Sequence, residues 1–140
     1  MPKPPLPPEI DEFLAAPNPS VIATLQSDAS PNTVATWYLW ENGRVLVNMD
    51  EGRKRLQFMR RDPRVSITVL GQDSWYHQVS LRGKVVAIEE DAGMVDIDRI
   101  SRHYTGEPYS DRDRARYSAW IEVEAWWGWA VTRPWEPDRR

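Results

Sequence analysis

Three consecutive cations carry the clearest chemistry in the sequence. Arg53, Lys54 and Arg55 follow a strand-like run at 44–49 and stand at the expected start of a helix. Cations are unfavourable there because the helix macrodipole is positive at its N-terminus, so a bound anion would offset the repulsion. A phosphate group is the simplest candidate. The alternative is a solvated charged face, since Arg and Lys are also good helix formers.

Composition argues against several other kinds of chemistry. The chain has no cysteine, which excludes a disulfide framework, a thiol nucleophile and a thiolate metal site within it. Two histidines, His77 and His103, are far apart in the sequence and make a poor metal constellation, so no metal site is expected. The net charge is −3 with acids and bases interspersed, which argues against a nucleic-acid surface. His77 remains a candidate proton donor to a bound substrate, and a structural role is its alternative.

Tryptophan is unusually abundant in this chain. Eight tryptophans, five tyrosines and two phenylalanines occur among 140 residues. Some are neighbours, as in the run Trp126-Trp127-Gly128-Trp129, so both faces of one strand must carry indole rings. This is more aromatic surface than one small core normally needs. We therefore expect a ligand or a second subunit to cover part of it.

The spacing of apolar residues predicts short helices between antiparallel strands. Asn42-Gly43 is the strongest hairpin signal, and Gly83 is expected at a bulge or a close approach within a long strand. Asp62-Pro63 ends the cationic helix because a residue before proline avoids the α region. The expected helices cover 9–16, 52–61 and 91–104, and the expected strands cover 21–25, 33–40, 44–50, 64–70, 75–89 and 116–132.

About six mainly antiparallel strands, without regular βαβ alternation, predict a mainly β fold with short helices (α+β) that closes or nearly closes into a barrel. We expect a proline-rich N-terminal arm at 1–8, one barrel domain at 9–132 and a charged C-terminal tail at 133–140. No segment approaches the ~20 apolar residues of a membrane span, and the first residues lack the apolar core of a signal peptide. The expectation is a cytoplasmic protein without membrane contact.

Several strings of the sequence, taken in order, resemble the flavin and deazaflavin oxidoreductases of the pyridoxamine-phosphate-oxidase-like, split β-barrel superfamily. Within that superfamily the chain is most similar to the actinobacterial branch that depends on coenzyme F420. The resemblance covers nearly residues 9–132, and it rests on the order and spacing of the strings rather than on any one of them. The strings are the cationic group, Arg60-Arg61-Asp62-Pro63-Arg64-Val65, Ser80-Leu81-Arg82-Gly83-Lys84-Val85 and Arg102-His103-Tyr104-Thr105-Gly106.

The resemblance implies a homodimer with two cofactor sites at the subunit interface. By position, Arg53, Lys54 and Arg55 would contact the cofactor phosphate. Two strands would line the ring pocket, through Thr36, Trp37, Tyr38, Val47, Asn48 and Met49, with Gln78 and Ser80 as further candidates on a facing strand. For Trp37 and Tyr38, a place in the core is the alternative. The chain departs from the family pattern at Gln57 and Phe58, where many members have a basic residue and an asparagine.

The function that the resemblance implies is an F420-dependent reductase. In such an enzyme the reduced deazaflavin transfers hydride to a polarised double bond of a small organic substrate, and the protein supplies position and electrostatics. This fits the lack of a convincing triad, carboxylate pair or metal cluster in the sequence. Two alternatives remain open. One is an FMN-dependent oxidoreductase on the same fold, and the other is a non-enzymatic protein that binds a cofactor, haem or pigment.

Overall fold

Eight antiparallel strands form one sheet in the computed structural model, which describes residues 1–130 and 133–137. The strands lie in the order β2-β1-β5-β6-β7-β4-β3, and β8 pairs with β7. Their bounds are β1 Ser20–Leu25, β2 Pro31–Thr36, β3 Leu39–Glu41, β4 Arg44–Asp50, β5 Arg64–Leu70, β6 His77–Glu90, β7 Arg116–Ala130 and β8 Arg133–Pro134. The helices are α1 Pro8–Ala15, α2 Lys54–Arg61 and α3 Val95–Thr105, and the 3-10 turn η1 Ala92–Met94 precedes α3.

The predicted fold class, mainly β with short helices, is confirmed. The prediction of one strand over 33–40 is wrong, because the backbone leaves the ladder at Trp37 and Tyr38. This break turns the side chain of Tyr38 into the core and places β2 and β3 at opposite ends of the strand order. Together with the short β8, it raises the count from about six strands to eight among the described residues. The predicted continuation of β7 to Thr132, and residues 138–140 of the predicted tail, lie outside those residues.

Two glycine-containing positions behave as the sequence predicts. Asn42 and Gly43 both have positive φ, 51° and 73°, and form the two-residue turn between β3 and β4. The pairing of β6 with β7 shifts register at Gly83. A Cβ atom at that position would lie 2.0 Å from the carbonyl oxygen of Glu122, so only glycine allows the two backbones to approach this closely.

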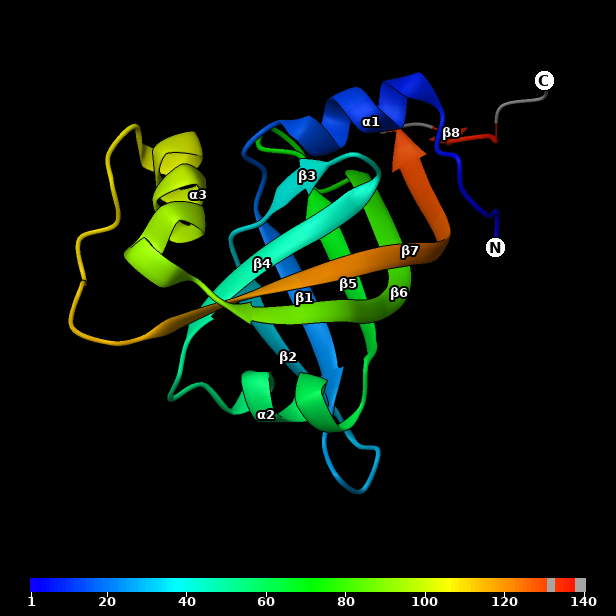
Figure 1. Cartoon of the computed structure of the whole chain (residues 1–140). Helices are drawn as coiled ribbons and strands as arrows, with labels where there is room; N and C mark the ends of the chain where they lie inside the picture. Colours follow the sequence, from blue (N-terminus) through cyan, green and yellow to red (C-terminus); the bar gives the residue numbers. More distant parts are fainter. Residues whose placement is uncertain (131–132, 138–140) are drawn as a thin grey trace.

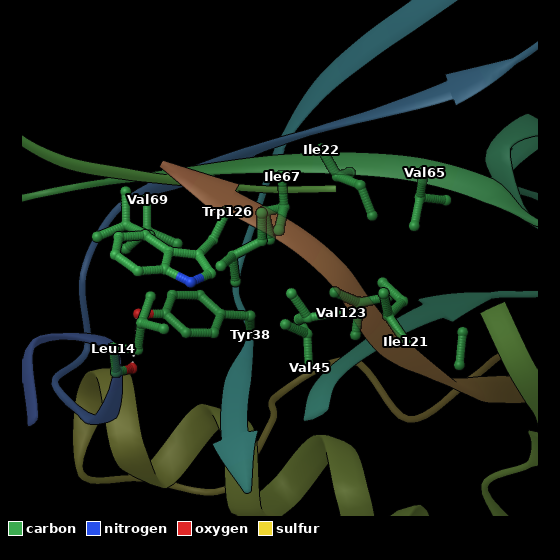
Figure 2. Packing of buried hydrophobic residues seen from close by; sticks show 14 of the residues in the cluster. Leu14, Ile22, Tyr38, Val45, Val65, Ile67, Val69, Ile121, Val123 and Trp126 are labelled. Atoms are coloured by element: carbon green, nitrogen blue, oxygen red, sulfur yellow. Dashed lines mark hydrogen bonds between the residues drawn. The ribbon is translucent and has the colours of Figure 1, made fainter. Parts of the chain in front are cut away.

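The core fills the interior of the curved sheet. Alternate residues of β5 point inward, with Val65, Ile67 and Val69 all buried. Trp126 of β7 and Tyr38 are the largest fully buried side chains. Figure 2 shows their rings side by side, with the Tyr38 hydroxyl directed toward Leu14. That hydroxyl donates a 2.8 Å hydrogen bond to the Leu14 carbonyl oxygen, which satisfies a polar group in an otherwise apolar setting.

The helices and the N-terminal arm cover the ends and one side of the barrel. In Figure 1, α1 lies across one end, α2 lies at the other, and α3 with the following loop stands to one side. The arm contacts the barrel, because Leu6 is buried in the core and the Trp126 backbone N–H donates to the Pro2 carbonyl oxygen. None of the described helices is long and apolar enough to cross a membrane.

Candidate functional site

A cavity of about 590 Å³ opens between the two ends of the strand order. One side of its wall comes from β2 and from Trp37, which lies between β2 and β3. The other side comes from β4, α3 and the first residue of β7. The N-terminus of α2 contributes Arg53 and Arg55. This volume is in the range of cavities that bind small molecules and cofactors.

Cationic side chains gather at one part of the cavity wall. Arg55 is half-buried, and Arg116 is only 8% exposed. No carboxylate in the described part of the chain lies within ion-pair distance of either guanidinium group. Asp50 instead pairs with Arg53 at 3.3 Å and with Arg114 at 3.8 Å. Two partly or fully buried arginines without an acidic partner are unusual, because buried charges are normally paired.

Arg55 illustrates the electrostatic cost of this arrangement. Burial lowers the pKa of its guanidinium, and repulsion from Arg53 and Arg116 lowers it further, whereas attraction to Asp50 is the smallest contribution. Its Nη2 atom donates a 3.3 Å hydrogen bond to the Asn48 carbonyl oxygen, while its buried Nε atom has no hydrogen-bond partner within 1–130 and 133–137. An anion in the cavity would relieve the repulsion and offer an acceptor.

Aromatic rings form the adjoining wall. Trp37, at the break between β2 and β3, is stacked on Tyr104 of α3 with ring centroids 5.2 Å apart and an interplanar angle of 11°. Tyr109, in the loop after α3, meets Trp37 edge to face at 6.3 Å. The same Tyr109 ring lies under the Arg116 guanidinium, 4.5 Å from its centre. These contacts join the aromatic wall to the cationic one.

Hydrogen bonding fixes the Tyr104 ring. Its hydroxyl donates to the Asn18 carbonyl oxygen at 2.7 Å and accepts from the Tyr38 backbone N–H at 3.4 Å. Burial raises the pKa of Tyr104 to about 12 and also raises the pKa of Tyr38. Both phenols are therefore neutral at physiological pH. Tyr104 contributes a flat aromatic ring to this wall, and hydrogen bonds of its hydroxyl group hold the ring in place.

The structure brings some of the predicted site residues together in this cavity. Five of them line it, namely Thr36, Trp37, Asn48, Arg53 and Arg55. Tyr38, Val47 and Met49 do not, because their side chains are buried in the core. Lys54 is exposed beside the cavity rather than in its wall.

Three further candidates lie elsewhere in the described structure. Gln78 and Ser80 are half-buried on β6, where they pair with Trp129 and Trp127 of β7. The His77 ring packs against Phe13 and Trp135, with centroids 4.3 and 4.9 Å away. None of the three lines the cavity in this chain.

Sequence reasoning did not identify every residue of the cavity wall, and those it missed include Tyr104, Tyr109 and Arg116. Tyr104 lies on the apolar stripe of an amphipathic helix, which predicts a core position. Tyr109 lies in a polar loop, and Arg116 begins a strand in a stretch rich in charge, so neither type nor spacing distinguishes them. For Tyr104 the available signal was its place in the string Arg102-His103-Tyr104-Thr105-Gly106, on which the family resemblance partly rests. No cluster of His, Asp or Glu able to hold a metal ion occurs among the described residues.

Comparison with known proteins agrees with this architecture. The family model "Pyridoxamine 5'-phosphate oxidase" matches residues 6–130. A solved structure named F420 reductase superimposes with a TM-score of 0.79 at 20% identity, covering 86% of this chain and 98% of that one. The conserved hypothetical protein Rv2991 from Mycobacterium tuberculosis gives a TM-score of 0.73 at 24% identity, covering 93% and 88%. HupZ from Group A Streptococcus gives 0.66 at 13% identity, covering 94% and 100%.

These structural likenesses, all under 25% identity, concern the fold. No curated protein matches the chain in sequence. The family model, however, spans most of the chain, including β1 to β7 and all three helices. The expected split β-barrel, α+β fold is thereby confirmed. The chain belongs to the pyridoxamine 5'-phosphate oxidase family, whose fold is that of flavin-binding oxidoreductases.

Proposed function

We propose that this protein is an oxidoreductase that binds the deazaflavin coenzyme F420, with FMN as the alternative cofactor, and reduces a polarised double bond of a small organic substrate. One observation carries the proposal: one cavity joins Arg55 and Arg116, which have no acidic partner among the described residues, to a wall of ordered aromatic rings. A phosphate-bearing, flat, ring-shaped cofactor needs both surfaces. The expected cytoplasmic location is part of this proposal.

The cationic wall fits a phosphate group. Arg55 has an unpartnered buried Nε atom, and Arg53 and Arg116 add positive charge around the same space. Charge-assisted hydrogen bonds from arginine to phosphate are among the strongest in proteins. The N-terminus of α2 lacks any acidic residue in its first turn, so an anion there would also complement the helix dipole.

The aromatic wall fits a flat heterocycle. Trp37 is 36% exposed, so part of its ring remains available after stacking on Tyr104. Aromatic side chains bind such rings through stacking and exclude water from one of their faces. When bound, the deazaflavin or flavin supplies the hydride chemistry. The chain's own residues bind the phosphate, orient the ring against Trp37 and restrict access of water.

The resemblance to the F420-dependent branch favours the deazaflavin, and the structural neighbour named F420 reductase supports this choice. F420 also carries an anionic tail beyond its phosphate. Arg60 and Arg61 lie in the last turn of α2, and both are exposed. They extend the positive field beyond the cavity on the same helix that begins at Lys54.

We also propose that the protein is a homodimer. Val21, Thr68, Ser80 and Trp127 are successive cross-strand partners on β1, β5, β6 and β7, so they form one row on the outer face of the sheet. Val21 and Trp127 are 38% and 46% exposed, which leaves apolar surface for a second copy to cover. Ser80, with Gln78 on the same face, would then lie at the interface, as the resemblance implies.

Titration of the purified protein tests the cofactor assignment. We expect a bound cofactor to quench tryptophan fluorescence, because Trp37 lies in the cavity wall. F420 should do so at lower concentrations than FMN, because F420 is the proposed cofactor. Trp37→Phe should reduce the quenching while leaving binding measured by calorimetry largely intact. A protein that is yellow when isolated from a host that lacks F420, or that binds FMN as tightly as F420, would assign it to the flavin alternative. Failure to bind either cofactor would contradict the proposed function.

A further inference from the structure

Arg116 is a largely buried cation held in a fixed orientation at the cavity wall. Its Nε atom donates a 2.8 Å hydrogen bond to the Asn48 Oδ1 atom, and its guanidinium lies over the Tyr109 ring. Its side chain comes from the first residue of β7, far in the sequence from the Arg53–Arg55 cluster at the start of α2. A long side chain that is 8% exposed, without a carboxylate partner among the described residues, requires a compensating interaction.

Asn48 connects the two arginines. Its side-chain oxygen accepts from Arg116, and its backbone carbonyl oxygen accepts from Arg55 at 3.3 Å. Both guanidinium groups are therefore held by one buried residue, with their positive charges close enough for Arg116 to lower the pKa of Arg55. The fold thus brings two like charges together, and no carboxylate of the described residues forms an ion pair with either of them.

The orientation of the Asn48 amide follows from a buried carboxylate. Asp91 accepts a 3.1 Å hydrogen bond from Asn48 Nδ2, and Ser118 Oγ lies at the same distance from that atom. A carboxylate can only accept, so the amide nitrogen must face Asp91 and the amide oxygen must face Arg116. Asp91 also accepts the backbone N–H groups of Asp96 and Ile97, both at 2.9 Å, which anchors it to the first turn of α3.

We propose that Arg116 is a second guanidinium donor to the phosphate-type anion that Arg55 binds, and that Asn48 and Asp91 are positioning residues that hold it in place. The proposal rests on the proposed function for the identity of the anion, a phosphate ester of the cofactor. The anion then touches two structural units, α2 through Arg55 and the start of β7 through Arg116. Its binding accordingly joins the two sides of the cavity.

Inorganic phosphate is the first probe, because it tests the anion site without requiring a ring to bind. We expect phosphate to raise the Tm of the wild-type protein, and Arg116→Met to lower the apparent phosphate affinity by roughly tenfold or more. Arg64→Met is the matched control: it removes the same charge from an exposed arginine that pairs with Asp62 at 2.7 Å. This control should keep wild-type phosphate affinity. Equal affinity in wild type and folded Arg116→Met would overturn the proposal.

Arg116→Lys provides a second variant if the methionine variant does not fold. Lysine keeps the charge but lacks the Nε donor that Asn48 orients, so we expect a severalfold loss of phosphate affinity. Unchanged affinity in this variant would also count against the proposal.

Non-additivity tests the positioning role. Asn48→Leu should weaken phosphate binding in the wild-type background but have no further effect in the Arg116→Met background. Asp91 keeps its two backbone donors in this variant, so α3 remains capped. Equal losses in both backgrounds would show that Asn48 acts through general structure and not through Arg116.

Comparison of F420 with its phosphate-free riboside extends the test to the cofactor. Arg116→Met should lower the affinity for F420 while leaving the affinity for the riboside nearly unchanged. If phosphate binding depends on Arg116 and neither F420 nor FMN binds, the proposed function fails and the anion site stands. If F420 binds equally well with and without Arg116, the proposed function stands and this inference fails.

Discussion

Trp37 and Tyr104 lie nearly parallel, with their ring centroids 5.2 Å apart and an interplanar angle of 11°. One residue is at the break between β2 and β3, and the other is near the end of α3. The Tyr104 hydroxyl donates a hydrogen bond to the Asn18 carbonyl oxygen, so the Tyr104 ring is fixed. Trp37 thus has a rigid support on one side and a face available to the cavity on the other.

Replacing Trp37 with alanine should weaken cofactor binding by roughly two- to tenfold, the range that corresponds to an aromatic pair. The loss should be the same for F420 and its phosphate-free riboside, because the ring is what both share. Calorimetric dissociation constants provide the measurement. Trp75→Ala is the control, since Trp75 is 70% exposed and lies outside the cavity wall. Equal affinities in wild type and Trp37→Ala would remove Trp37 from the site.

The stability of the fold should decrease at alkaline pH because of Tyr104. Burial raises its pKa from 10.0 to about 12, so between these values the folded protein retains a proton that the unfolded chain releases. The corresponding stability is complete below pH 10 and is lost as the pH rises through about 12. Urea unfolding of wild type and Tyr104→Phe from pH 8 to 12 measures this effect. The free energy of unfolding should decline less steeply with pH in the variant than in the wild type. Identical slopes would contradict the raised pKa of Tyr104.

Within the cationic cluster, the three residues should contribute unequally to phosphate binding. Arg55→Ala should weaken F420 binding by roughly tenfold or more, as expected for loss of a charge-assisted hydrogen bond. Lys54→Ala should have little effect, because Lys54 is exposed and lies outside the cavity wall. The triple alanine variant at 53–55 should still fold, because Arg53 and Lys54 are exposed and the half-buried Arg55 has no ion-pair partner among the described residues. An unchanged dissociation constant in the triple variant would identify the cluster as a solvated face.

Salt should distinguish the two candidate cofactors. F420 carries more negative charge than FMN beyond the ring, and the exposed Arg60 and Arg61 extend the positive field along α2. Such exposed charges are progressively screened as the Debye length falls to about 10 Å at 0.1 M salt. We expect the F420 dissociation constant to rise more steeply than that of FMN between 0.02 and 0.5 M salt, taken as roughly the low and high limits of screening. If the two dissociation constants depend equally on salt, the result would argue against contacts between the protein and the anionic tail of F420.

The mass in solution tests the proposed dimer. Light scattering should give twice the 16.3 kDa of one chain at micromolar concentration. Trp127→Glu should shift the protein toward the monomer, because it replaces an exposed indole with a charge in the row that Val21, Thr68, Ser80 and Trp127 form on the outer face. Val95→Glu is the control, as Val95 is 60% exposed on α3 and lies outside that row. A wild-type mass of 16.3 kDa would refute the dimer.

Local patterns were sufficient for most of the elements of this fold. Asn42-Gly43 predicts its hairpin because both residues tolerate positive φ, and Asp62-Pro63 predicts the end of α2 because proline restricts the preceding residue. Gly83 also behaves as predicted, since a strand glycine indicates close approach of another backbone. One exception is 33–40, where alternation predicts one strand and the burial of Tyr38 divides it, and another is the short β8, which lies in the predicted tail.

The sequence by itself determined that cations gather at the start of α2, and it located Asn48 on the correct strand. It placed Trp37 within a strand, whereas the residue lies at the break between β2 and β3. It could not separate Arg55, which enters the cavity wall, from Lys54, which does not, because neighbouring helical residues differ only in direction. Arg116, Tyr104 and Tyr109 reach the site only through the path of the sheet, which places the start of β7 and the end of α3 beside β4 and the β2–β3 break. Contacts between residues so far apart in sequence depend on chain closure and packing, so only the tertiary structure decided them.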